Sequence, residues 1–172
     1  MVTIILSGNP KEASAVPAKV SVLRQPPTSL PPQAMTGEAI SPAEARLAMS
    51  LANRRYYVVP ASGRAHGDLC LVEAKPDSTA ATCFARAALS RTAPYLFSPG
   101  PGGTIDLAGI AADAFDRASI SGVSTPIVNN VFAFNHAHTA DHFTVYGPQG
   151  QLRVDLGSMS PTSTVTVTQP TS

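Results

Sequence analysis

The chain has 172 residues, a formal net charge of +1 and a charged-residue content of 13%, about half of the ~25% that is usual in soluble domains. A chain of this length forms one ordinary domain and buries enough surface to fold without a metal or a mesh of disulfides. The balanced charge argues against nucleic-acid binding, because that function needs a basic field and the longest basic run here is Arg54-Arg55. The hydrophobic content of 44% argues against disorder of the whole chain.

Three regions follow one another along the chain. Residues 1–40 are predicted to be an extended, Pro-rich segment, because each proline fixes its own φ and favours extended geometry in the residue before it. Within this segment, residues 20–23 are predicted to form a strand. Residues 41–157 are predicted to be a globular, strand-rich domain, and residues 158–172 a tail rich in Thr, Ser and Pro.

The strongest local pattern predicts a helix over residues 41–54. Residues 41–44 (SPAE) combine a capping serine, a proline at the first helical position and a glutamate three residues after the cap. Leu47 and Leu51 then recur at helical spacing. A second short helix is predicted around residues 79–89.

The rest of the domain is predicted to consist of strands. The clearest hairpin joins residues 142–146 to residues 151–156, since both arms alternate apolar and polar residues around a turn that contains Gly and Pro. The loop 98–103 (SPGPGG) is predicted to be a connector rather than a phosphate cradle, because a strand follows it and no lysine is near. Further strands are predicted at residues 56–59, 69–73, 104–110, 117–120 and 127–134. The predicted fold class is therefore α+β and strand-rich: a small antiparallel β sandwich or sheet with one or two short helices.

The only two cysteines, Cys70 and Cys83, are predicted to form one disulfide, because a single turn separates them. Closing so short a loop stabilises a protein by about 3 kcal/mol on the chain-entropy model. The alternative is a pair of free, buried cysteines that behave as small hydrophobic residues. A zinc site at the cysteines is disfavoured, since the sequence has neither a CxxC motif nor a second ligand pair nearby.

The disulfide, the low charge and the abundance of Thr and Ser favour an extracytoplasmic location, in a secreted or cell-surface protein. No stretch approaches the ~18 apolar residues that a transmembrane segment requires. The N-terminal residues 1–6 are apolar, but they lack a basic region and are too short for a signal peptide. We therefore expect the sequence to be a mature or truncated form of an exported protein.

The densest polar cluster contains His136, His138, Asp141 and His142. On a strand, His136 and His138 would point to one face, and Asp141 or His142 would complete three ligands for zinc or another divalent metal. The alternative is a polar loop between two strands, because Asn, His, Thr and Asp favour turns.

A second candidate site consists of Arg54, Tyr56 and Tyr57, which would form a sugar- or anion-binding surface. The packing of a helix end on a strand explains the same residues equally well. No catalytic residue is predicted, because the sequence has no GxSxG elbow and its aspartates are dispersed.

The segments 107–118 (LAGIAADAFDRA) and 125–133 (TPIVNNVFA) resemble a stretch in uncharacterised exported or membrane-anchored proteins of high-GC actinobacteria. Those proteins often carry an upstream cysteine pair like Cys70 and Cys83. The resemblance covers roughly residues 55–156. It implies a location and a style of fold, and no activity.

These observations favour a non-enzymatic, extracytoplasmic structural or binding module, which would be a component of a surface, an envelope or a multi-subunit assembly. Protein partners are expected, in a homo-oligomer or a larger assembly, because residues 3–6 and 164–168 have patterns suited to adding a strand to a partner's sheet. The alternative is a metal-binding protein or metal-dependent enzyme that uses His136, His138 and His142.

Overall fold

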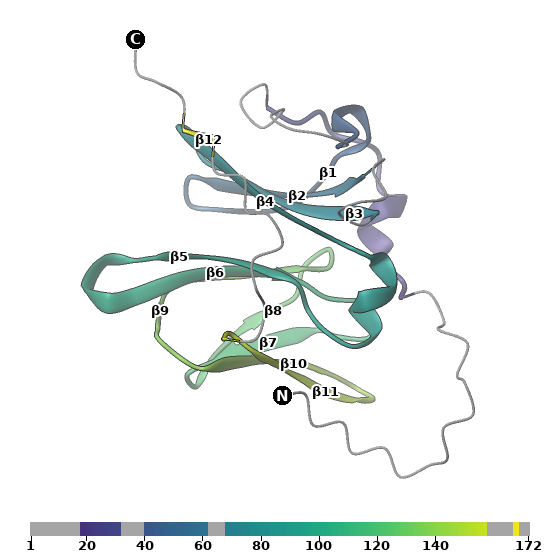
Figure 1. The fold of residues 1–172 in the computed structure, drawn as a ribbon. Coiled ribbons are helices and arrows are strands. Elements are labelled where there is room, and N and C mark those ends of the chain that lie inside the picture. Colours follow the sequence, from purple (N-terminus) through teal and green to yellow (C-terminus); the bar gives the residue numbers. More distant parts are fainter. Residues whose placement is uncertain (1–17, 32–39, 62–67, 158–166, 169–172) are drawn as a thin grey trace.

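The computed structural model describes residues 18–31, 40–61, 68–157 and 167–168, and these residues form three antiparallel sheets stacked face to face (Figure 1). The first sheet has the strand order β1–β2–β3–β4–β12, the central sheet β5–β6–β9 and the third sheet β11–β10–β7–β8. The strands are β1 (Arg46–Leu51), β2 (Arg54–Pro60), β3 (Leu69–Ala74), β4 (Ser78–Phe84), β5 (Tyr95–Pro99), β6 (Thr104–Ile110), β7 (Arg117–Ile120), β8 (Val123–Pro126), β9 (Val131–His138), β10 (His142–Gly147), β11 (Gly150–Asp155) and β12 (Val167–Thr168). Four short 3₁₀ helices accompany them in the described residues: η1 (Ser21–Arg24), η3 (Pro42–Glu44), η4 (Arg86–Ser90) and η5 (Pro101–Gly103).

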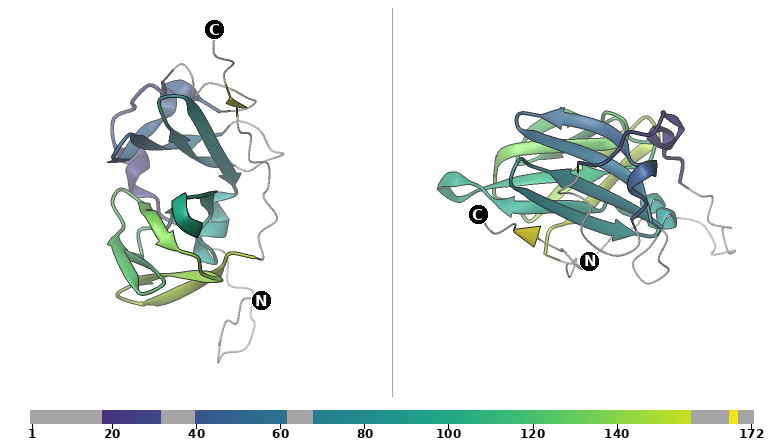
Figure 2. Two further views of the ribbon diagram at one scale, coloured as in Figure 1. Left: turned by 90° about the vertical axis from the view of Figure 1, so that its left-hand side faces the viewer. Right: turned by 90° about the horizontal axis from the view of Figure 1, so that it is seen from above.

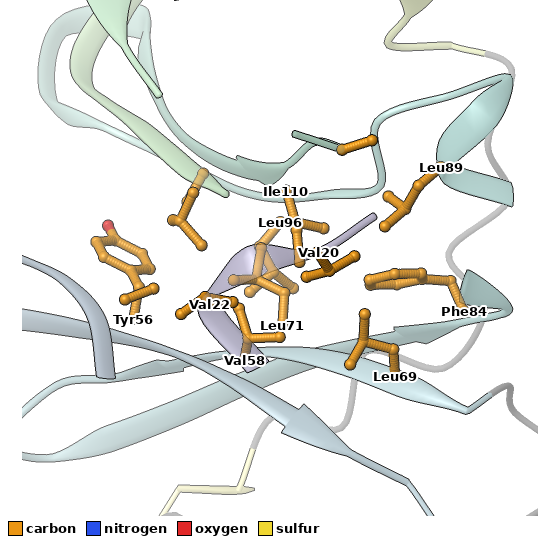
Figure 3. Packing of buried hydrophobic residues seen from close by; sticks show 14 of the residues in the cluster. Val20, Val22, Tyr56, Val58, Leu69, Leu71, Phe84, Leu89, Leu96 and Ile110 are labelled. Carbon is orange, nitrogen blue, oxygen red and sulfur yellow. The ribbon is translucent and has the colours of Figure 1, made fainter. Parts of the chain in front are cut away.

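The central sheet is buried on both faces over residues 107–110 of β6 and 131–134 of β9, where successive side chains point to opposite sides. In β6, Ile110 belongs to the hydrophobic cluster shared with the first sheet, whereas Leu107 belongs to the cluster shared with the third sheet. In β9, Val131 and Phe132 alternate in the same way. Figure 3 shows the first of these clusters, in which side chains from the two sheets meet. The strand-rich fold predicted from the sequence is therefore confirmed, as are the strands of the 142–156 hairpin.

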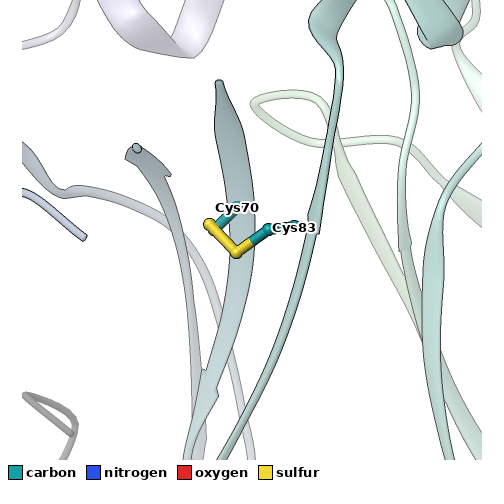
Figure 4. The surroundings of a disulfide bond; sticks show 2 residues. All are labelled: Cys70 and Cys83. Atoms are coloured by element: carbon teal, nitrogen blue, oxygen red, sulfur yellow. A yellow bond between two sulfur atoms is a disulfide. The ribbon is translucent and has the colours of Figure 1, made fainter. Parts of the chain in front are cut away.

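A third cluster covers the opposite face of the first sheet. Tyr57 and Val72 lie on this face and belong to the same cluster as Leu30 and Ala45, which precede β1. The predicted disulfide is confirmed and lies here as well: Cys70 of β3 and Cys83 of β4 are directly opposed cross-strand partners with their Cα atoms 4.0 Å apart (Figure 4). The disulfide therefore fixes the pairing of β3 with β4.

Reduction of the Cys70–Cys83 disulfide is expected to lower the free energy of unfolding by about 3 kcal/mol, because the unfolded chain loses a closed loop. The measurement is urea denaturation with and without reductant. The double variant Cys70→Ala/Cys83→Ala is the control, since reductant should not change its stability. An equal midpoint for the oxidised and reduced wild type would contradict the prediction.

The helix predicted over residues 41–54 is wrong. Residues 42–44 form only the 3₁₀ helix η3, and Arg46–Leu51 is the strand β1, which pairs with β2 across a two-residue loop. Leu47 and Leu51 do not share a face of this strand: a register shift between Leu47 and Met49 places Leu47 against the third cluster and Leu51 against the first. Pairing with the strongly apolar β2 outweighs the local helical signal, as tertiary context commonly does.

The helix predicted around residues 79–89 is wrong over its first half. Ser78–Phe84 is the strand β4, paired with β3 from Thr79 to Phe84, and only Arg86–Ser90 is helical, as the 3₁₀ helix η4. Alanine-rich residues favour a helix locally, but here the hydrogen-bond ladder and the disulfide to β3 hold them in a strand.

The strand predicted over residues 127–134 begins later than expected. Asn129 and Asn130 have φ of +49° and +69°, which a type I′ turn requires, and they separate Val128 from Val131. The strand β9 therefore starts at Val131, and the preceding short strand β8 was not predicted.

The described part of the predicted N-terminal segment belongs to the domain core. Val20 and Val22 are buried between the first and central sheets, so a domain boundary at residue 40 does not separate residues 18–31 from the rest. The strand predicted over residues 20–23 is wrong, since Ser21–Arg24 is the 3₁₀ helix η1. No helix in the described residues is long and apolar enough to span a membrane.

Candidate functional site

A group of polar residues lies where the first and central sheets meet at one end of their shared core. We call it the Arg54 cluster. It continues the inward-facing positions of three strands: Arg54 precedes Tyr56 by two residues in β2, Glu73 follows Leu71 by two in β3, and Asp106 precedes Ala108 by two in β6. Figure 3 places Tyr56 at the end of the packed side chains, with its hydroxyl directed away from its own strand. The cluster consists of Arg54, Tyr56, Glu73, Lys75, Asp106 and His136.

Arg54 is the centre of the cluster, because its guanidinium contacts carboxylates from both sheets. Its Nη1 donates to Oε1 of Glu73 in β3 at 3.3 Å, and its Nη2 donates to Oδ2 of Asp106 in β6. The side chains of Glu73 and Asp106 are only 9% and 6% exposed, so both charges depend on nearby cations. Lys75 supplies a second cation, with Nζ 3.6 Å from Oε2 of Glu73. The arrangement ties the two sheets together by paired charges.

Tyr56 is held as a neutral phenol. Its hydroxyl donates to Oε1 of Glu73 at 3.2 Å, and the residue is almost fully buried. Burial and the neighbouring charge of Glu73 raise the pKa of Tyr56. A phenol in this state does not serve as a base at neutral pH, so Tyr56 acts as a hydrogen-bond donor.

Asp106 also holds His136, which is the most exposed member of the cluster. A register shift between β6 and β9 places His136 beside Asp106, and its backbone has φ of +53°. The backbone N–H of His136 donates to Oδ1 of Asp106 at 2.8 Å, and the imidazole Nδ1 lies 3.2 Å from the same oxygen. Burial disfavours the charge of Asp106, but the hydrogen bonds from His136 and Arg54 outweigh it and lower the pKa of this carboxyl.

The cluster thus has a paired, buried part and an open part. In the buried part, the charge of Arg54 is paired with those of Glu73 and Asp106. These ion pairs suit the three residues to holding the first and central sheets in register. The imidazole of His136 is 56% exposed and faces solvent while its Nδ1 is held by a carboxylate. The contact occupies Nδ1, so Nε2 is the ring nitrogen that remains for another partner.

The predicted binding residues Arg54, Tyr56 and Tyr57 form no common surface. Tyr56 and Tyr57 point to opposite faces of β2 and belong to different hydrophobic clusters. Both tyrosines are buried, with exposed fractions of 1% and 2%. Arg54 faces inward with Tyr56, so its charge is used within the protein.

The predicted metal ligands divide into two groups. His136 contacts Asp106, whereas His142, the first residue of β10 in the third sheet, has its Nδ1 2.5 Å from Oδ1 of the preceding residue, Asp141. The hydrogen bond from His142 lowers the pKa of Asp141. His138 is exposed on β9. Among the described residues, no three His, Cys, Asp or Glu side chains come together in a metal-binding group.

Glu73 and Asp106 were not predicted as site residues. The available signal was their position, since each continues a series of buried residues at a spacing of two along its strand. Their contacts with Arg54 depend on how the first and central sheets stack, and no local sequence pattern predicts that stacking.

Comparisons of the chain with protein-family models, with curated proteins and with solved structures find no match. The resemblance to exported actinobacterial proteins therefore stays a prediction.

Proposed function

We propose that this protein is a non-enzymatic, extracytoplasmic module that binds or builds part of a surface, an envelope or a multi-subunit assembly. The observation that carries the proposal is an exposed phenylalanine on an unpaired strand edge. Phe97 of β5 is 61% exposed, and within the part of the chain that the structure describes β5 pairs only with β6. The Cys70–Cys83 disulfide supports the location, because such bonds persist in oxidising compartments.

The edge of β5 is suited to contact with another chain. The β5–β6 hairpin extends beyond the neighbouring strands on one side of the molecule in both the side view and the view from above (Figures 1 and 2). An exposed strand edge offers unpaired N–H and C=O groups, and an exposed aromatic side chain adds apolar contact area. Addition of a partner strand uses both features.

Two other features support a structural role. The buried charges of the Arg54 cluster are paired with one another and stabilise the stacking of two sheets. The C-terminal segment adds a strand to a sheet edge, since β12 pairs with β4 through Val167–Thr168. This pairing lies within one chain, and it supports the expectation that residues 164–168 suit strand addition. Residues 3–6, predicted for the same role, lie outside the described residues.

The test is sedimentation of the oxidised chain over a range of concentrations. The wild type is expected to form discrete oligomers, and Phe97→Lys is expected to shift them towards monomer, because a lysine on the edge opposes strand pairing. Val123→Lys is the matched control: Val123 is 52% exposed on β8, another edge strand, and its replacement should leave the oligomers intact. A wild type that sediments as a monomer at every concentration would count against the proposal.

A second candidate function is the binding of a divalent metal, and the contact between Asp106 and His136 favours it. A carboxylate that holds one imidazole nitrogen commonly orients a metal-ligating histidine and raises its basicity. If His136 is a ligand, zinc titration should show one ion per chain, with binding lost in His136→Ala and retained in His142→Ala. Equal binding by wild type and His136→Ala would exclude His136 as a ligand.

A further inference from the structure

The backbone of β5 directs its hydrogen-bonding groups alternately towards β6 and towards the outer edge of the central sheet. Two bonds fix which residues face β6: the N–H of Ile110 donates to the carbonyl of Pro94 at 3.0 Å, and the N–H of Gly100 donates to the carbonyl of Thr104 at 2.8 Å. Pro94 and Gly100 flank β5, and the register between β5 and β6 runs without a shift. The even-numbered residues of β5 therefore bond to β6, and the odd-numbered residues face the edge.

The edge-facing residues of β5 are Tyr95, Phe97 and Pro99, a pattern that is symmetric about Phe97. Tyr95 and Phe97 each offer an N–H and a carbonyl, whereas Pro99 offers only a carbonyl. When two copies of this edge run antiparallel with Phe97 opposite Phe97, the N–H of each Phe97 meets the carbonyl of the other. The N–H of each Tyr95 then meets the carbonyl of Pro99 in the other copy. A second copy of β5 therefore pairs every N–H that this edge offers.

A row of aromatic rings leads from the core to the same edge. The ring centroids of Phe132 and Phe143 lie 5.4 Å apart, Tyr95 follows at 5.5 Å from Phe143, and Phe97 follows at 6.2 Å from Tyr95. Phe97 is the last ring of the row and is 61% exposed. Directly opposed residues of an antiparallel pair share one face, so a second copy sets its own Phe97 beside this ring. The row then continues in reverse order into the core of the second copy.

The charge of the edge also favours a copy of itself. Residues 92–105 include no charged side chain, so two copies bring no like charges together at this contact. Proteins commonly protect exposed strand edges from pairing with charged side chains. β11, an edge strand of the third sheet, has such residues in Arg153 and Asp155, whereas β5 has none. Charge complementarity therefore selects an uncharged partner strand, which β5 itself is.

We infer that β5 pairs antiparallel with β5 of a second copy of the chain, with Phe97 at the two-fold axis, and joins the two central sheets into one. The inference rests on the proposed assembly function and names the contact between copies. An interface of this kind uses the same surface on both copies, so it closes as a dimer. The protrusion of the β5–β6 hairpin, seen in Figures 1 and 2, lets a second copy approach the edge.

The first measurement is amide hydrogen exchange of the oxidised wild-type chain over a range of protein concentrations. The N–H groups of Tyr95 and Phe97 should exchange rapidly in the monomer and slowly once two copies pair. Those of Leu96 and Ser98 should be protected at every concentration, because they bond to β6. The control is the N–H of Ser124, which faces the outer edge of β8 and should show no dependence on concentration.

The second measurement tests the register, by isotope-filtered nuclear Overhauser contacts in a mixture of labelled and unlabelled wild-type chains. The antiparallel pair predicts contacts between the two Phe97 rings and from Tyr95 of one copy to Pro99 of the other. Tyr95 and Pro99 of a single copy lie four residues apart on one strand, which is about 13 Å, so one copy alone does not produce the contact.

The outcomes separate this inference from the proposed function. Oligomers in which the N–H groups of Tyr95 and Phe97 still exchange rapidly overturn the inference and leave the assembly function standing. Oligomers that protect these groups without the contact between Tyr95 and Pro99 of different copies also overturn it, because another strand or another register then covers the edge. A wild type that forms no oligomers overturns both.

Discussion

Replacement of Gly147 by alanine is expected to destabilise the protein by about 3 kcal/mol, at the upper end of what overpacking usually costs. An alanine Cβ at this position would lie 1.8 Å from the carbonyl oxygen of Ala114 and 2.9 Å from its carbonyl carbon. Both are backbone atoms, so no side chain can turn away to make room. Gly147 also closes the β10–β11 hairpin opposite Gly150, which prevents a simple shift of the strand.

The measurement for Gly147→Ala is urea denaturation followed by circular dichroism, with Gly157→Ala as the control. A Cβ at Gly157 meets no atom within 4 Å, so that variant should remain within ~0.5 kcal/mol of wild type. A Gly147→Ala protein as stable as the Gly157→Ala protein would show that the close approach of Ala114 to β10 is not present in solution.

Replacement of Arg54 by methionine is expected to lower the free energy of unfolding by about 3–5 kcal/mol, because it leaves buried carboxylates without their shared cation. Methionine keeps much of the length of the side chain, so lost packing contributes little. Lys75 remains near Glu73, but it does not contact Asp106 in the structure. Arg55→Met is the matched control: Arg55 is the next residue of β2 and is exposed, so its replacement should have an effect within ~0.5 kcal/mol.

The cost of Arg54→Met should depend on pH. The pKa of Asp106 is lowered in the folded protein, so its contribution to stability is complete above the unfolded pKa of ~3.9 and is lost as the pH falls through the lower folded value. Removal of Arg54 should raise the folded pKa of Asp106, which makes the variant less sensitive to acid. The difference in the free energy of unfolding between the wild type and Arg54→Met should therefore become smaller below about pH 4. A constant difference from neutral to acidic pH would contradict the ion-pair explanation.

The strands that were predicted correctly are those whose local pattern agrees with their packing. The hairpin of β10 and β11 alternates apolar and polar residues around a Gly- and Pro-containing turn, and the disulfide joins residues on either side of another turn. The helix over residues 41–54 failed because a capping pattern lies directly before a strand whose partner, β2, is identified only by pairing. A local sequence pattern does not show whether the capping signal or the pairing with β2 will determine the structure of this segment.

The Arg54 cluster could be predicted only in part. Arg54 and Tyr56 were identified as polar residues of interest, but no local pattern connects them with His136, which lies 82 positions after Arg54. Asp106 makes that connection through β6 of the central sheet. Sheet stacking and the register shift at His136 are non-local properties, so they become visible only in the folded structure.

The most direct test of the proposed assembly function is native mass spectrometry of the full chain, with and without reductant. We predict discrete multimers of the oxidised chain, with each chain two mass units lighter than after reduction because of the Cys70–Cys83 bond. A chain that remains monomeric at every concentration, whether or not it holds the disulfide, would contradict the role as an assembly component.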